Sequence, residues 1–198
     1  MWTELQKRYA GRVAFQWKIA LMDASGFPKT IEQAEWFYRR SGMMMRSPIM
    51  LKPGWFKPNL KETLEPNLVA EAARELGVTD DRIWIALSNA TEVDGIQTCD
   101  FETAATIGAK AGGLEKAKLL ERARSPQIEK RVRETTAEFH AMQVTQRPTF
   151  VIESDIGDRA IFSGFAKLEP IATTLDAMLD DIVSYEAYAA HFGQPPAA

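Results

Sequence analysis

The stretch TQRPTFVI, from Thr145 to Ile152, places a proline directly before a short apolar run of the kind that forms buried β-strands. Proline lacks an amide hydrogen, so in a sheet it occurs at the first residue of a strand, at an edge or at a bulge. Pro148 is therefore expected to mark the beginning of a strand, at a position where the pairing of that strand is interrupted.

A hairpin and a long helix are predicted to follow. The hairpin strands cover Thr149 to Ile152 and Arg159 to Phe162, and SDIGD between them predicts a turn around Gly157. The final helix runs from about Leu168 to His191, with one apolar side that is expected to be buried. The residues of that side are Ile171, Leu175, Met178, Ile182, Tyr185 and Phe192.

A further strand is predicted far upstream, over residues 12–22, where apolar and polar residues alternate. A short helix precedes it, and a block of helices separates it from Pro148, the last of them opened by Ser125-Pro126. The order is helix, strand, helices, strand, strand, helix, which predicts an α/β fold. The alternating apolar residues are Val13, Phe15, Trp17, Ile19 and Leu21.

Composition narrows the class of protein. The chain has 198 residues, of which 45% are hydrophobic and 26% charged, and these values are typical of a globular protein. A net charge of −3 argues against a nucleic-acid partner, and no apolar run is long enough to span a membrane. Because the first residues, Met1 to Arg8, lack the apolar stretch of a signal peptide, a cytoplasmic location is expected.

The sequence offers no dithiol and no metal-binding motif. Cys99 is the only cysteine, so the chain can form neither an internal disulfide nor a Cys-x-x-Cys motif. His140 and His191 are isolated from each other and from Cys99, and this spacing does not suit a metal site. Cys99 is expected to be a small buried thiol or a residue near a helix cap.

The order of elements around Pro148 resembles the thioredoxin fold of the DsbA-like family, in particular its FrnE-like and 2-hydroxychromene-2-carboxylate isomerase-like branches. The specific segments are SPQIEKRVRETTAEFHAMQVTQRPTFVI and DRAIFSG, and NLVAEAARELG is similar to a helix of the family's insert. The resemblance implies that residues 1–28 are the first half of a thioredoxin core, residues 29–125 a helical insert and residues 126–198 the second half. It also implies a cis bond before Pro148.

The same resemblance identifies a part of the family pattern that this sequence lacks. In the family, a first strand and an active-site turn with a dithiol or a serine precede the first helix, whereas Met1 falls within that helix. Two interpretations remain open: a chain shortened from a longer protein, which we favour, or a complete binding module without redox chemistry. In the first, one strand's width would separate residues 12–22 from the strand at 149–152.

The resemblance implies a thiol–disulfide oxidoreductase whose dithiol is absent from this chain, so catalytic residues are expected to be missing. Arg147 and Pro148, flanked by Gln146 and Thr149, would hold a thiol or disulfide peptide. A glutathione-dependent isomerase of the 2-hydroxychromene-2-carboxylate type is the alternative enzyme, with Arg147 pairing a glutathione carboxylate. A non-catalytic peptide-binding module is the third alternative. No cofactor is required, glutathione is the candidate, and a homodimer is compatible with the family.

A methionine-rich segment, SGMMMRSPIMLKPGWF from Ser41 to Phe56, is predicted to be a loop. Methionine side chains adapt to varied surfaces, so Met43 to Met45 could contact diverse substrates. The alternative, which we favour, is a loop that packs these methionines between the insert and the core.

Overall fold

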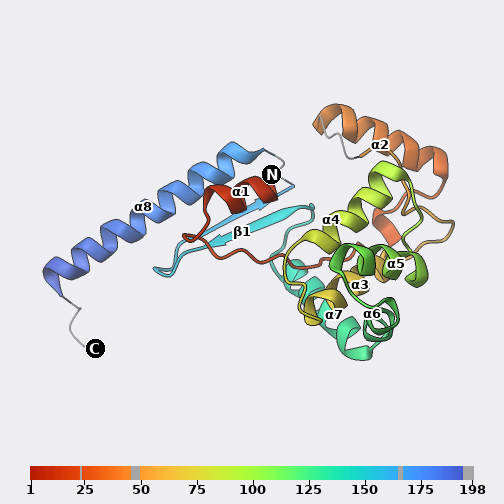
Figure 1. The fold of residues 1–198 in the computed structure, drawn as a ribbon. Helices are drawn as coiled ribbons and strands as arrows, with labels where there is room; N and C mark the ends of the chain where they lie inside the picture. Colours follow the sequence, from red (N-terminus) through yellow and green to blue (C-terminus); the bar gives the residue numbers. More distant parts are fainter. Residues whose placement is uncertain (23, 46–49, 165–166, 194–198) are drawn as a thin grey trace. The chain divides into compact units, whose positions relative to one another are not determined.

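The computed structural model describes residues 1–22, 24–45, 50–164 and 167–193 (Figure 1). The chain is rich in helices and contains one small sheet. Its helices are α1 (Trp2–Arg8), α2 (Ile31–Met45), α3 (Leu64–Glu75), α4 (Arg82–Ser88), α5 (Phe101–Gly112), α6 (Lys116–Ala123), α7 (Pro126–Ala141) and α8 (Leu168–Phe192). A short 3-10 helix forms η1 (Ala24–Gly26), a π-helical segment forms η2 (Asn89–Asp94), and the strands are β1 (Thr149–Glu153) and β2 (Arg159–Ser163).

Two compact units make up the molecule. The first combines Met1–Gln16 with Met142–Ala198, and the second consists of Trp17–Ala141. We call them the α/β unit and the helical unit. These boundaries follow packing, and the division into two thioredoxin halves and an insert at residues 28 and 125 stays a prediction.

The helical unit is built around α5, whose small residues let the neighbouring helices approach closely. A Cβ atom added to Gly108 would lie 2.9 Å from a methyl carbon of Val69 in α3 and 3.3 Å from one of Leu119 in α6. Leu119, Ile128 and Val132 are fully buried in the same core. Within each helix the backbone amide and carbonyl groups bond to one another, so this core needs no partner strand to pair its main chain.

The α/β unit has a smaller core, between α1, α8 and one face of the hairpin. Leu5 and Tyr9 from α1 and its end pack with Ile171, Ala172 and Leu175 from α8. The Tyr9 hydroxyl lies 2.8 Å from the Ala172 carbonyl oxygen and 2.9 Å from a carboxylate oxygen of Asp176. The core is covered by partly buried residues, namely Val13, Phe15, Phe150, Ile152, Phe162, Leu168 and Leu179.

The strand predicted over residues 12–22 is not part of a sheet, so this prediction was wrong. The alternation is present, since Ile19 and Leu21 are buried while Lys18 is exposed, but the described residues form one two-stranded sheet of β1 and β2. A strand requires a neighbour to pair with, and α7 side chains take that place here. The Thr135 hydroxyl donates to the Ile19 carbonyl at 2.8 Å, and the Leu21 amide donates to the Thr136 hydroxyl at 3.1 Å.

Two further predictions need correction. The segment Met43 to Met45 is not a loop, because α2 continues through Met45. Methionine has a favourable helix propensity, so these three residues extend the helix. The side chains of Met43 to Met45 lie outside what the structure describes. The apolar side of α8 is buried only in its first half, whereas Tyr185 and Phe192 are 59% and 66% exposed.

None of the helices within the described residues is long and apolar enough to cross a membrane.

Candidate functional site

The site predicted from the sequence lies at the head of the β1–β2 hairpin. The two strands are antiparallel and pair from Thr149 with Ser163 to Glu153 with Arg159. Gly157 closes the turn with a φ of 99°, and its amide donates to the Ser154 carbonyl at 3.1 Å. The predicted hairpin and its turn are therefore confirmed, with each strand one residue longer than predicted.

Pro148 stands one position before β1, and the bond between Arg147 and Pro148 is cis, as the resemblance predicts. The Pro148 carbonyl accepts a hydrogen bond from the Gly164 amide at 2.9 Å, which extends the ladder by one pair. Gly164 has a φ of 70°, and a Cβ atom there would lie 2.7 Å from Cβ of Gln146. Only glycine fits this position, because both its backbone conformation and its contact with Gln146 exclude a side chain.

The four predicted residues come together around this point. The Thr149 hydroxyl donates to the Gln146 carbonyl at 2.7 Å and lies 3.4 Å from the Ser163 hydroxyl. Gln146 and Pro148 are exposed, while Arg147 and Thr149 are half-buried. Ser163 and Gly164 also belong to the site. The hairpin register could have identified them from the sequence, because a turn around Gly157 places Ser163 opposite Thr149 and Gly164 opposite Pro148.

The backbone of β1 presents free hydrogen-bonding groups on the side away from β2. Ladder bonds join Gly164 to Pro148 and, at the turn, Ser154 to Asp158. Because bonded and non-bonded pairs alternate in an antiparallel ladder, Phe150 and Ile152 also bond to β2. Thr149, Val151 and Glu153 therefore direct their amide and carbonyl groups to the opposite edge, where the described residues place no further strand.

The two faces of this edge differ. Phe150 points into the core, where the Trp2 ring lies 6.4 Å from its ring and 5.3 Å from that of Phe15, measured between centroids. On the opposite face Val151 and Ile161 are cross-strand partners that are 38% and 40% exposed. The edge thus combines unpaired main-chain groups with an exposed apolar pair, which suits the addition of an extended peptide strand.

Cys99 belongs to the helical unit and does not act as an exposed thiol. It precedes Asp100, the N-cap residue of α5, and is 1% exposed, as predicted for a buried residue near a cap. The pKa of Cys99 is raised to about 12, mainly by burial. The nearby Glu65 carboxylate also raises this pKa, and its effect is larger than the opposite effect of the Lys57 ammonium. Since the thiolate is the reactive form, this thiol is inert near neutral pH.

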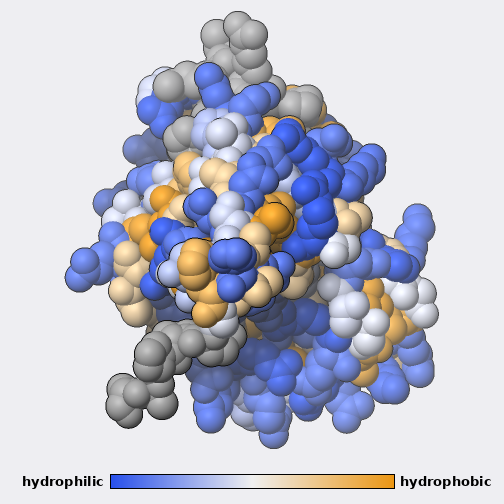
Figure 2. All heavy atoms as spheres, turned by 90° about the vertical axis from the view of Figure 1, so that its left-hand side faces the viewer, coloured by the Kyte–Doolittle hydropathy of each residue, from blue (hydrophilic) through white to orange (hydrophobic). Residues whose placement is uncertain are grey.

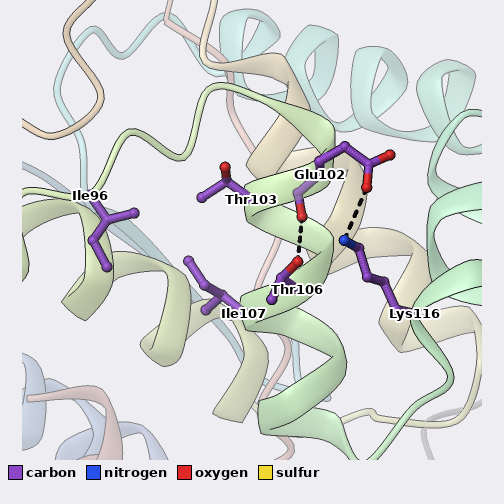
Figure 3. A pocket seen from close by; sticks show the side chains of 6 residues that line it. All are labelled: Ile96, Glu102, Thr103, Thr106, Ile107 and Lys116. Carbon is purple, nitrogen blue, oxygen red and sulfur yellow. Dashed lines mark hydrogen bonds and ion pairs between the residues drawn. The ribbon is translucent and has the colours of Figure 1, made fainter.

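The structure also contains a shallow hollow of about 320 Å³ beside α5 (Figure 3). Its polar groups already bond to one another. The Lys116 ammonium lies 3.0 Å from the Glu102 carboxylate, and the Thr106 hydroxyl donates to the Glu102 carbonyl at 2.7 Å. Within the described residues, no three histidine, cysteine or acidic side chains are grouped as a metal site would require.

Comparison with known proteins finds a similar solved structure but no matching sequence family. No family model matches the chain, and no curated protein matches it. The chain is similar to a solved structure titled "Crystal structure of a putative protein disulfide isomerase from Nitrosomonas europaea", with a TM-score of 0.68 and 14% identity. The likeness covers 90% of this chain and 88% of that one, so it supports the predicted DsbA-like fold.

Proposed function

We propose that this protein belongs functionally with the DsbA-like thiol–disulfide oxidoreductases and binds an extended thiol or disulfide peptide along the outer edge of β1. The single observation that carries the proposal is the open edge beside Pro148, where Thr149, Val151 and Glu153 direct main-chain groups away from β2. The likeness in fold to a protein titled as a disulfide isomerase supports the choice of a thiol or disulfide peptide as the ligand.

In this proposal the chain's own residues bind and orient the substrate. The peptide backbone pairs with Thr149 and Val151, and an apolar side chain of the peptide contacts Val151, whereas Ile161 lies one strand further away on β2. Arg147 and Gln146, at the head of the strand, orient the end of the peptide that carries the sulfur. Disulfide exchange needs an attacking thiolate, and Cys99 cannot supply one because it is buried with a raised pKa. The attacking thiolate therefore comes from a second, external thiol compound, which attacks the disulfide of the bound peptide, forms a mixed disulfide with one peptide sulfur and releases the other sulfur as a thiolate.

A glutathione-dependent isomerase of the 2-hydroxychromene-2-carboxylate type is a second candidate. It is favoured by the position of Arg147, a half-buried cation beside the open edge, since guanidinium groups recognise carboxylates well. A non-catalytic peptide-binding module is a third candidate, favoured by the inert state of Cys99.

The test uses two proline variants that differ in the edge they block. Val151→Pro removes the amide that faces the open edge of β1, while Ile161→Pro removes the matching amide on the outer edge of β2. Val151 and Ile161 are a non-bonded cross-strand pair, so neither variant removes a ladder bond. We expect Val151→Pro to weaken binding of a fluorescein-labelled, valine-rich octapeptide with one cysteine at least about tenfold, which corresponds to about 1.4 kcal/mol.

Ile161→Pro should bind this peptide within about twofold of the parent chain, which is a change of under about 0.5 kcal/mol. Fluorescence anisotropy measures both, and circular dichroism verifies that both variants are folded. Equal loss in the two variants, or no binding to the parent chain, would refute the proposal. Titration calorimetry of glutathione against the parent and Arg147→Gln separates the second candidate, because only an isomerase of that type needs Arg147 for glutathione.

A further inference from the structure

Helix α8 continues beyond the core that holds its first half. Ile171 and Leu175 are buried in one cluster with Leu5 and Tyr9, and Met178 is buried one turn further along. The C-terminal part of the helix extends past α1 and the hairpin (Figure 1), and Tyr185 and Phe192 are exposed. The last three turns of α8 are therefore ordered without a partner that packs on them in the described part of the chain.

The exposed end carries the same apolar stripe as the buried half. Ile182, Tyr185, Ala189 and Phe192 follow Met178 at intervals of three or four residues, so they lie on the side of α8 that faces the core further along. The Tyr188 ring packs on the Phe192 ring with their centroids 4.5 Å apart. Figure 2 shows the side of the molecule that is on the left in Figure 1, and on this face apolar residues lie among hydrophilic ones.

Charges of one sign accompany this stripe. Residues 168–192 contain five carboxylates and no lysine or arginine. At 100° per residue, Asp181 lies on one side of the stripe and Glu186 on the other. Neither carboxylate forms an ion pair within the described residues, whereas Asp176, next to the core, is held by Arg8 at 2.5 Å. The stripe is thus a hydrophobic band bordered by unneutralised negative charge.

We propose that the outer end of α8, from Ile182 to Phe192, binds a cationic amphipathic helix of another protein. Such a helix would lay its apolar side on Tyr185, Ala189 and Phe192 and place lysine or arginine residues against Asp181 and Glu186. This complementarity selects the occupant. A second copy of α8 would bring Asp181 and Glu186 against identical charges, and an anionic membrane surface would be repelled by the same carboxylates.

The proposal is tested on the full chain with two synthetic 18-residue helical peptides that share one leucine stripe. One peptide carries lysine and the other glutamate at the flanking positions. We expect the lysine peptide to bind and the glutamate peptide to bind at least about tenfold more weakly. Tyr185→Ser should weaken binding of the lysine peptide about tenfold. Val183→Ser is the matched control, because Val183 is 64% exposed on the opposite side of the same helix.

A charge reversal provides the second arm. In the double variant Asp181→Lys and Glu186→Lys, the preference should switch to the glutamate peptide. The proposal is overturned if the parent chain binds neither peptide, if Val183→Ser weakens binding as much as Tyr185→Ser, or if the double variant keeps its preference. Sedimentation that shows a dimer abolished by Tyr185→Ser, without peptide binding, would overturn it in favour of a second copy. Val151→Pro should leave this binding unchanged, which keeps the test separate from that of the β1 edge.

Discussion

The helical unit and the α/β unit differ in the surfaces that they offer to other chains. The helical unit has the larger buried core, whereas the α/β unit has an unpaired strand edge and an exposed helix end. In the helical unit, Leu119, Ile128 and Val132 are fully buried and the surrounding helices satisfy their own backbone groups. In the α/β unit, a small core leaves one edge of β1 and the end of α8 uncovered. Strand edges and amphipathic helix ends are the features that bind further chains, so we place the binding functions in the α/β unit.

The largest effect that would sharpen this contrast is expected from truncating a large side chain in each unit. Leu119→Ala opens a cavity among α3, α5 and α6, and such changes cost about 2–5 kcal/mol of stability. Tyr185→Ala removes a side chain that is already in solvent, so it should change stability by less than about 0.5 kcal/mol. Urea denaturation measures both. Similar losses in the two variants would show that the end of α8 is packed in solution and would end the comparison.

A smaller effect is expected from pH, through one carboxyl group of the helical unit. Glu92 lies in η2, and its carbonyl accepts the amides of Leu51 and Lys52 at 2.9 and 2.8 Å. Burial of its side chain raises the pKa of Glu92 from 4.5 to about 7. Between these values the folded state binds more protons than the unfolded state, so stability should fall as pH rises from about 4.5 to 7 and level off above.

This difference in the pKa of Glu92 between the folded and unfolded states corresponds to about 3 kcal/mol in the free energy of unfolding. Glu62, Asp80 and Asp100 oppose it, because their lowered pKa values make the fold more stable as pH rises above the acid range. Glu92→Gln keeps the shape and these three groups, so the difference in unfolding free energy between parent and variant isolates Glu92. That difference should change by about 3 kcal/mol between pH 4.5 and pH 8. A constant difference would mean that Glu92 is solvated.

The sequence predicts the local elements of the α/β unit well, because their signals are local. The proline before TFVI, the glycine of SDIGD and the helical spacing after Leu168 each depend on a few neighbouring residues, and the hairpin and α8 lie where they are predicted. Pairing between segments that are distant in sequence cannot be predicted from such local signals. Residues 12–22 alternate as a strand would, yet alternation reports burial on one side and does not supply a partner strand.

The same distinction applies to the site. Gln146, Pro148 and Thr149 could be predicted from their positions around one proline, whereas Ser163 and Gly164 join them only through the register of the hairpin. The apolar stripe of α8 predicts burial along its whole length, but the rest of the unit is too short to cover the last turns. Periodicity defines which side of a helix is apolar, and the size of the remaining fold decides how much of that side is buried.

The smallest expected effect concerns the place where the helical unit holds a strand-like segment without a sheet. The Thr136 hydroxyl accepts a hydrogen bond from the Leu21 amide and donates to the Val132 carbonyl at 2.8 Å. Thr136→Val keeps the shape of the side chain and removes both bonds, so we expect a loss of about 1 kcal/mol, the net value of a typical intramolecular hydrogen bond. Hydrogen exchange at the Leu21 amide should become faster, since that amide loses its bond to α7.

Thr174→Val is the matched control for this change. The Thr174 hydroxyl donates to the Pro170 carbonyl within α8 at 2.9 Å. Among the described residues, it makes no hydrogen bond to a segment outside α8. Its loss should cost less than about 0.5 kcal/mol, because the carbonyl keeps its helical environment. If Thr136→Val proves as mild as Thr174→Val and leaves exchange at Leu21 unchanged, the Thr136 hydroxyl does not hold the extended segment. The extended segment would then be held by its other contacts, among them the bond from the Thr135 hydroxyl to the Ile19 carbonyl and the burial of Ile19 and Leu21.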